Sequence, residues 1–183
     1  KDWERVIKLL VTGVDRIASN CDILCFASNT AHMSYATVVK KYPHLPVLHI
    51  ADVTAYEIKK IKKNTAVKKI GLLGTEPTMT ENYLKDRLAL HNIETLVPES
   101  DEDLNKVFWY IMNDFSFKKF TDEARNFFKK LIDEMVKRGA EGVILGCTEI
   151  ELLELEGCCD IPLFRSAQLH INAIARVQAG ITP

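Results

Sequence analysis

Short runs of consecutive apolar residues alternate along this chain with longer segments in which apolar residues recur every three or four positions. The apolar runs lie at residues 23–26, 46–49, 67–73, 93–97, 142–146 and 162–164. A strand of a parallel sheet is covered on both faces, so its residues are apolar without alternation. Strands of this kind, separated by helical segments, predict an α/β fold built on parallel sheets.

The segments between the runs carry apolar stripes at the spacing of helices. They lie at residues 3–18, 56–61, 83–88, 101–113 and 122–136, and a last helix starts near residue 168. Thr121 is placed to cap the helix at 122–136, and Gly139 is placed to end it. Thr78 or Thr80 is placed to cap the helix at 83–88.

One pattern recurs over a long interval. The sequence DILCFASN at 22–29 and the sequence GVILGCTE at 142–149 both follow a helix, with an offset of 120 residues. Each is followed by a strand that begins with proline, at Pro46 and Pro162. A repeat of this length predicts two similar α/β halves whose parallel sheets face a central cleft, rather than a solenoid.

We expect the first half to consist of residues 1–57 together with 163–183, and the second half to consist of residues 58–162. The first half starts directly at a helix and has only two recognisable strands, which is few for a stable sheet. We therefore expect this half to be truncated at its N-terminal side, either as a fragment or with another subunit covering the exposed sheet edge.

Charge and composition exclude several classes of protein. The net charge of −1 over 183 residues gives no electrostatic reason to expect nucleic acid or an anionic membrane surface as a partner. No run approaches the ~18 apolar residues of a membrane span, and the first residues do not resemble a secretory signal, so we expect a cytoplasmic protein. The five cysteines lack paired C-x-x-C spacing, so neither a disulfide framework nor a metal site is predicted.

Small polar residues follow the apolar runs where ligands bind in open α/β sheets, beyond the carboxyl ends of the strands. Residues 28–30 follow the first run, Gly74-Thr75 follows the third, and residues 147–149 follow the run at 142–146. Backbone N–H groups and hydroxyls at such turns can hold a carboxylate. Cys147 is suited to act as a base or nucleophile if its pKa falls from about 8.5 towards neutrality. Core packing explains a cysteine at this position equally well.

Two of these segments, ASNTAH at 27–32 and ILGCTEI at 144–150, resemble the paired signatures of the aspartate/glutamate racemase family. Residues 48–52, 70–75 and 120–125 also resemble aspartate racemases. The resemblance extends over nearly all of the chain. It implies an isomerase of amino-acid metabolism, a racemase of a small acidic amino acid, aspartate in the first place or glutamate. It further implies a homodimer that uses no pyridoxal phosphate, metal or other cofactor.

In this family a cysteine from each half flanks the α-carbon of the substrate. One thiolate removes the α-proton, and the other thiol returns a proton on the opposite face. The resemblance makes Cys147 one of these two groups. It assigns substrate contacts to Ser28, Asn29, Thr30, Thr78, Thr148 and Glu149, and a pairing with the side-chain carboxylate to Lys119, with Lys118 as the alternative. Glu149 either polarises the thiol of Cys147 or pairs with another neighbour.

The position of the first catalytic cysteine is occupied by Ala27, which cannot move a proton. Three explanations stay open: an engineered exchange, a natural one-base enzyme, or a catalytically inactive binding protein. A single-cysteine decarboxylase or isomerase of a related dicarboxylate is a further alternative. Loss of a positioned acid or base costs ~10²–10⁴ in rate. Cys25 lies two residues earlier, roughly 6–7 Å away along a strand, and we expect it to be buried and too deep to substitute.

Three histidines and one arginine complete the set of candidate residues. His32 either orients a carboxylate or starts a helix, and His49 and His170 fit hydrogen-bonded positions in the interior. Arg165 stands where the family usually has an acidic residue, and we interpret this change as structural.

Overall fold

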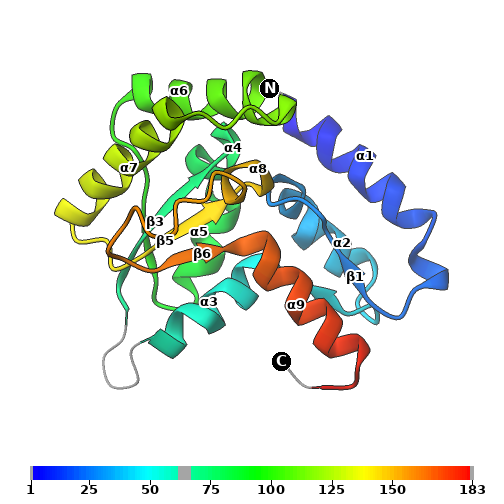
Figure 1. The fold of residues 1–183 in the computed structure, drawn as a ribbon. Helices are drawn as coiled ribbons and strands as arrows, with labels where there is room; N and C mark the ends of the chain where they lie inside the picture. The colour runs from blue at the N-terminus through cyan, green and yellow to red at the C-terminus, as the bar shows by residue number, and fades with distance from the viewer. Residues whose placement is uncertain (1, 62–66, 182–183) are drawn as a thin grey trace.

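The computed structural model describes residues 2–61 and 67–181, which form two parallel sheets. The larger sheet has the order β4-β3-β5-β6, and the smaller sheet pairs β1 with β2 (Figure 1). Their bounds are β1 (Leu24–Cys25), β2 (Val47–Leu48), β3 (Lys69–Gly74), β4 (Glu94–Leu96), β5 (Val143–Gly146) and β6 (Leu163–Arg165). The prediction of an α/β fold with parallel sheets is confirmed.

The α-helices are α1 (Trp3–Asp15), α2 (Tyr35–Lys41), α3 (Ile50–Ile61), α4 (Glu76–Thr80), α5 (Asn82–Ala89), α6 (Asp101–Asn113), α7 (Asp122–Lys137), α8 (Thr148–Glu151) and α9 (Ser166–Gln178). Short 3-10 segments are η1 (Ala18–Asn20), η2 (Thr30–Ser34) and η3 (Phe115–Phe117). Thr121 caps α7 as predicted, because its side chain accepts a hydrogen bond from the N–H of Ala124. None of the helices in the described part of the chain is long and apolar enough to cross a bilayer.

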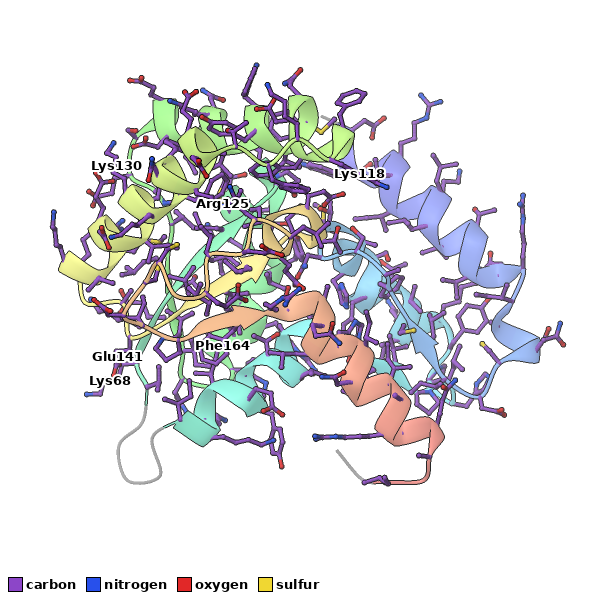
Figure 2. The ribbon with its side chains drawn as sticks, viewed as in Figure 1. Lys68, Lys118, Arg125, Lys130, Glu141 and Phe164 are labelled. Carbon is purple, nitrogen blue, oxygen red and sulfur yellow. The ribbon has the colours of Figure 1, made fainter. Side chains whose placement is uncertain are left out.

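The larger sheet is covered on both faces, so alternate residues of its central strands enter two different cores. In β5, Ile144 packs against α3 and α5, whereas Val143 and Leu145 pack on the side of α6 and α7. Figure 1 shows α6 and α7 on one side of this sheet and α3 on the other. Phe164 of β6, labelled in Figure 2, belongs to the core on the α3 side. The continuous hydrophobicity of β3 and β5 follows from this double coverage.

The smaller sheet is buried on one face and partly open on the other. Leu24 and Phe26 are buried against Val14 of α1 and Val38 of α2, whereas Cys25 is exposed. The expectations that this strand is covered on both faces and that Cys25 is buried are therefore wrong. An apolar run shows that a strand is suited to coverage on both faces. Whether both faces are covered depends on the helices and strands that pack around it.

The short helices were the least predictable elements. The expectation that Thr78 or Thr80 caps the helix at 83–88 is wrong, because both lie inside α4 and Glu81 is the N-cap of α5. Thr80 instead donates a hydrogen bond from its hydroxyl to the carbonyl of Glu76. A helix of five residues is too short to show an apolar stripe.

The two sheets are connected through α3 and α9, which lie against each other. The helix α3 follows β2, and α9 leaves the end of β6 and extends to the side of the molecule that carries β1 and α2 (Figure 1). The strand β6 pairs with β5 in the larger sheet, although residues 163–183 were expected in the first half. The division of the chain into two halves, with boundaries at 57/58 and 162/163, stays a prediction.

Candidate functional site

Strand ends from both sheets line one cavity of about 490 Å³. The segment 27–30 after β1 and the segment 147–149 after β5 both contribute to its wall, and Thr75 after β3 joins them. The helices supply a largely apolar remainder, consisting of Ile50, Ile111, Met112, Ser116, Ala167, His170, Ile171 and Ile174. The repeat in the sequence therefore corresponds to two strand ends that share a cavity.

Cys147 is the buried thiol of this cavity. It directly follows Gly146 at the end of β5 and precedes α8, and its Sγ lies 2.9 Å from Oε2 of Glu149. Burial, and to a smaller extent the hydrogen bond to Glu149, raise the pKa of the thiol to about 12. The N–H groups of Glu149 and Ile150 act in the opposite direction, but they do not outweigh burial. The thiol is therefore protonated at neutral pH.

Glu149 accepts two hydrogen bonds at the same carboxylate oxygen. Cys147 donates one from its thiol, and Thr148 donates the other from its hydroxyl over 2.6 Å. Burial opposes ionisation of this carboxyl, but these two hydrogen bonds hold its pKa below the usual value. Glu149 is thus an anion that contacts both the thiol of Cys147 and the hydroxyl of its neighbour Thr148.

Asn29 is buried, with 7% of its surface exposed, and it belongs to the cavity wall. Its Nδ2 donates a hydrogen bond to Oγ of Ser166 over 3.2 Å, and its Oδ1 has no hydrogen-bond partner among the described residues. A buried acceptor without a donor costs about 1–3 kcal/mol. This oxygen is itself closed off from solvent.

A series of four hydroxyl groups extends from the cavity into the protein. Thr30 and Thr75 line the cavity, with their Oγ1 atoms 3.1 Å apart. Thr75 contacts Thr78 over 3.0 Å, and Thr78 contacts the hydroxyl of Tyr83 over 3.1 Å. Thr78 is fully buried and lies behind Thr75, outside the set of residues that line the cavity.

The two lysines predicted for a substrate carboxylate lie outside the cavity wall. Lys119 pairs with Asp114, with Nζ 2.9 Å from Oδ1, and most of its side chain is exposed. Lys118 is exposed and ends η3 in a left-handed conformation with φ of 59°; Figure 2 labels it on the loop between α6 and α7. Both lysines follow Ser116, which does line the cavity.

The first strand end places three exposed residues in the cavity wall: Cys25, Ala27 and Ser28. Ala27 lies at the position where the family resemblance expects a thiol. Cys25 is exposed and lines the same cavity as Cys147, and the expectation that it cannot substitute for a thiol at position 27 stays a prediction. Exposure of Cys25 follows from the open face of the smaller sheet, which periodicity alone does not reveal.

A group of three buried histidines holds the first strand end against α3 and α9. His32 donates from Nδ1 to the carbonyl of Ser28 and accepts from the N–H of Ile50 at Nε2, over 2.9 and 3.2 Å. His170 donates from Nε2 to the carbonyl of Leu48. The ring of His32 lies 4.6 Å from that of His49 and 5.7 Å from that of His170. Burial lowers the pKa of all three, to about 4 for His32 and about 3 for His49.

Arg165 lies outside this cavity. Its Nε is 3.8 Å from carboxylate oxygens of both Glu151 and Glu156. Glu151 is buried and accepts hydrogen bonds from the N–H groups of Ala167 and Gln168 at the start of α9. The positive charge of Arg165 therefore lies beside a buried carboxylate, and its structural interpretation stays a prediction.

Two residues of the cavity system carried no clear signal in the sequence as site residues. Ser166 contacts Asn29 from the first turn of α9, and Cys25 lines the cavity because it is exposed on the smaller sheet. Within residues 2–61 and 67–181, no group of three or more His, Cys, Asp or Glu side chains is arranged to hold a metal ion.

The family model described as Asp/Glu/Hydantoin racemase matches residues 1–174. The chain belongs to this racemase family. The matched region includes both strand ends of the cavity, with Ala27 in one and Cys147 in the other. Membership assigns the chain to a family of isomerases that act on amino acids and related compounds, and it does not determine whether this chain is active.

Individual members of the family are similar over nearly the whole chain. A crystal structure of a candidate Asp/Glu racemase from Yersinia pestis has 30% sequence identity and a TM-score of 0.84, and the match covers 97% of this chain and 76% of that one. An aspartate racemase homologue from Pyrococcus horikoshii OT3 has 28% identity and a TM-score of 0.80, with the same coverage. These similarities support the racemase fold of the chain.

A glutamate racemase from Hydrogenobaculum sp. (strain Y04AAS1) is 26% identical over 173 residues. The match covers 91% of this chain and 58% of that racemase. The chain therefore spans little more than half the length of this curated relative.

Proposed function

We propose that this racemase-family protein racemises a small acidic amino acid, aspartate in the first place or glutamate, without a cofactor and with Cys147 as an acid/base group. The observation that carries the proposal is the cavity that Cys147 shares with the segment 27–30. Glutamate racemases and aspartate racemase homologues among the relatives support an acidic substrate. The protein is proposed to work as a cytoplasmic homodimer.

In the proposed reaction the resting thiol of Cys147 first passes its proton to the carboxylate of Glu149, to which it is hydrogen-bonded. The thiolate then takes the α-proton of the substrate, which leaves a carbanion and restores the thiol. Return of the proton from Cys147 regenerates the original configuration. Inversion requires a second proton donor on the opposite face of the α-carbon.

Substrate contacts are proposed for the polar side chains that line the cavity near Cys147. Asn29, Thr30 and Thr148 are proposed to hold the α-carboxylate and the α-ammonium group, together with Ser28 and Glu149. Thr78 is proposed to act through Thr75, since its hydroxyl contacts that of Thr75.

Lys119 is proposed to bind the side-chain carboxylate of the substrate, with Lys118 as the alternative. In the ligand-free structure Lys119 is bonded to Asp114, so this role requires exchange of one carboxylate partner for another. Both lysines are within three residues of Ser116 in the cavity wall, which supports a short movement rather than a rearrangement of the fold.

Ala27 limits the reaction in this chain, because it cannot return a proton on the second face. The chain is proposed to exchange the α-proton of one enantiomer but to invert it poorly. Ala27→Cys is proposed to add the missing group and to raise the rate of inversion by about 10²-fold or more.

The test is the interconversion of L- and D-aspartate by the full-length protein and by its Ala27→Cys variant, followed by circular dichroism. The expected result is slow interconversion by the parent and faster interconversion by the variant. Ser28→Cys, one residue away in the same segment, is the matched control for introducing a thiol. Equal rates for parent and Ala27→Cys, with aspartate bound by both, contradict the proposal and favour an inactive binding protein.

A further inference from the structure

A second cavity, of about 340 Å³, lies between α3 and α9. These two helices lie against each other (Figure 1), and Leu48 of β2 and His91 after α5 complete the walls. Among the described residues, none lines both this cavity and the cavity of Cys147. Its volume falls within the range of roughly 300–1,000 Å³ that is typical of small-molecule sites.

The helix α9 separates the two cavities, because each of them uses a different face of it. The residues of α9 that line the second cavity lie at positions 169, 172, 173 and 176. Residues of α9 that line the cavity of Cys147, such as Ala167 and Ile171, lie on the opposite face of a helix with 3.6 residues per turn. A ligand of the second cavity is therefore held apart from the proposed reaction.

Apolar side chains from three elements meet in the second cavity. Leu48 of β2 and Leu169 of α9 are half-buried, whereas Val53 of α3 and Ala173 of α9 are buried. Apolar surface that stays in contact with water gains free energy when another apolar group covers it. This part of the cavity is thus suited to the apolar body of a ligand.

The two carboxylates that line the cavity already have cationic partners. Asp52 accepts hydrogen bonds from Nε and Nη2 of Arg87 over 2.8 and 2.6 Å. An oxygen of Glu57 lies 2.7 Å from Nζ of Lys60. Their negative charges are balanced within the protein, so they do not favour a cationic ligand.

Two donors of α9 are left for a ligand in this cavity. None of the described residues pairs with the guanidinium of Arg176, which is exposed and lines the cavity. Asn172 accepts a hydrogen bond at Oδ1 from Gln168 over 3.0 Å, and its NH₂ group has no partner in the described part of the chain. Residues four positions apart lie on one helix face, so both donors can serve one anionic group. A carboxylate fits them, because it only accepts hydrogen bonds and pairs well with a guanidinium.

We propose that the cavity between α3 and α9 is a second small-molecule site, which binds a carboxylic acid with a compact apolar body. The carboxylate lies at Asn172 and Arg176, and the apolar body covers the leucine, valine and alanine side chains of the cavity. This site goes beyond the proposed function and does not depend on it.

The test uses 4-phenylbutyrate as the probe and its neutral amide, 4-phenylbutanamide, as the matched control ligand. Both are titrated into the full-length protein at about pH 7, where the acid is ionised, and binding is followed by isothermal titration calorimetry. The acid is expected to bind about tenfold more tightly than the amide. Arg176→Gln is expected to reduce the affinity for the acid to that for the amide, and to leave the amide unchanged.

Arg16→Gln is the matched control variant, because Arg16 is an exposed arginine at the end of α1 that lines neither cavity. It is expected to bind the acid as the parent does. Equal weakening by Arg16→Gln and Arg176→Gln shows a general attraction of anions to the protein and overturns the proposal.

The place of binding is tested with the same exchange on the two faces of α9. Ala173→Leu fills part of the second cavity and is expected to weaken 4-phenylbutyrate about tenfold or more. Ala167→Leu makes the same change in the wall of the cavity of Cys147 and is expected to leave the affinity unchanged. The reverse result places the probe in the cavity of Cys147 and overturns the proposal.

The proposal is also overturned if the parent does not bind 4-phenylbutyrate, if it binds acid and amide equally, or if Arg176→Gln has no effect. Arg176→Gln alters an exposed side chain, so this variant decides the question even where Ala173→Leu does not fold. Tighter binding of the acid by the parent, lost in Arg176→Gln and kept in Arg16→Gln, supports the second site.

Discussion

The thiol of Cys147 donates a hydrogen bond to the carboxylate of Glu149, with Sγ and Oε2 2.9 Å apart. The two residues belong to one short segment at the end of β5, so the contact depends little on how distant parts of the chain pack. It keeps the sulfur protonated at rest, because an adjacent anion and burial both disfavour a thiolate. It also supplies the group that must receive the proton before the sulfur can act as a base.

Exchange of Glu149 for glutamine is expected to make the thiol of Cys147 more reactive. The neutral amide removes the negative charge that raises the pKa of the thiol from its hydrogen-bonding position. A fall of one pKa unit gives about a tenfold higher thiolate fraction at about pH 8. The measurement is the rate of alkylation of Cys147 by iodoacetamide, followed by mass spectrometry of its peptide.

Cys25 provides an internal control for this comparison, since it is exposed and lies in the same cavity. Its alkylation rate is expected to be the same in the parent and in Glu149→Gln. Slower alkylation of Cys147 in Glu149→Gln, with Cys25 unchanged, contradicts the account of the hydrogen bond.

Acid is expected to destabilise the protein through His32. Burial lowers its pKa from 6.5 to about 4 in the folded state, so below 6.5 the unfolded chain binds a proton that the folded chain does not. The contribution of the neutral ring to the free energy of unfolding is fully present above pH 6.5 and is lost as the pH falls towards 4. Between about pH 7.5 and about pH 5 the loss from this residue is on the order of 2 kcal/mol. The nearby His170 and Asp52 influence the same ring in opposite directions.

The measurement for His32 is urea denaturation of the parent and of His32→Asn at both pH values. The variant is expected to be less stable at the higher pH, because two hydrogen bonds of the ring are lost, but to lose less stability on acidification. His44→Asn is the control, because His44 is exposed. The account is wrong if His32→Asn and the parent lose stability equally between the two pH values.

The core beside α7 is expected to depend strongly on Phe128. This ring is fully buried, and its centroid lies 5.6 Å from those of Phe115 and Phe127. Phe128→Ala is expected to lower the free energy of unfolding by about 3–5 kcal/mol. Phe117→Ala makes the same chemical change at a side chain that is 77% exposed, and an effect within about 0.5 kcal/mol is expected there. Urea denaturation of both variants tests the difference, and equal effects contradict the assigned core.

Much of the larger sheet could be predicted from the sequence because its strands are covered on both faces. Ile144 and its neighbours are all buried, so each contributes to the apolar run that predicts β5. The helix α7 was predictable for a similar reason, since its stripe continues over several turns and Thr121 marks its start. Short elements such as α4 and α8 lack this redundancy, and contacts with the rest of the fold decide their conformation.

The site could be predicted where its residues follow a strand directly, as Asn29 and Cys147 do. Residues that contact the site from distant parts of the sequence could not be predicted. Ser166 meets Asn29 across 137 positions of sequence, and no local pattern indicates that pairing. The exposure of Cys25 depends on which elements cover the smaller sheet, and the bond of Lys119 to Asp114 depends on the turn after α6.

The most direct test of the account is the exchange of the α-proton of L- and D-aspartate in deuterated water, measured by NMR with the full-length protein and with Cys147→Ser. The account predicts that the parent exchanges the α-proton of one enantiomer with its configuration retained, because only one face has an acid/base group. Cys147→Ser is expected to reduce that exchange by about 10²–10⁴. Exchange by Cys147→Ser at the rate of the parent, or no exchange of either enantiomer by a parent protein that binds aspartate, would contradict Cys147 as the acid/base group of this site.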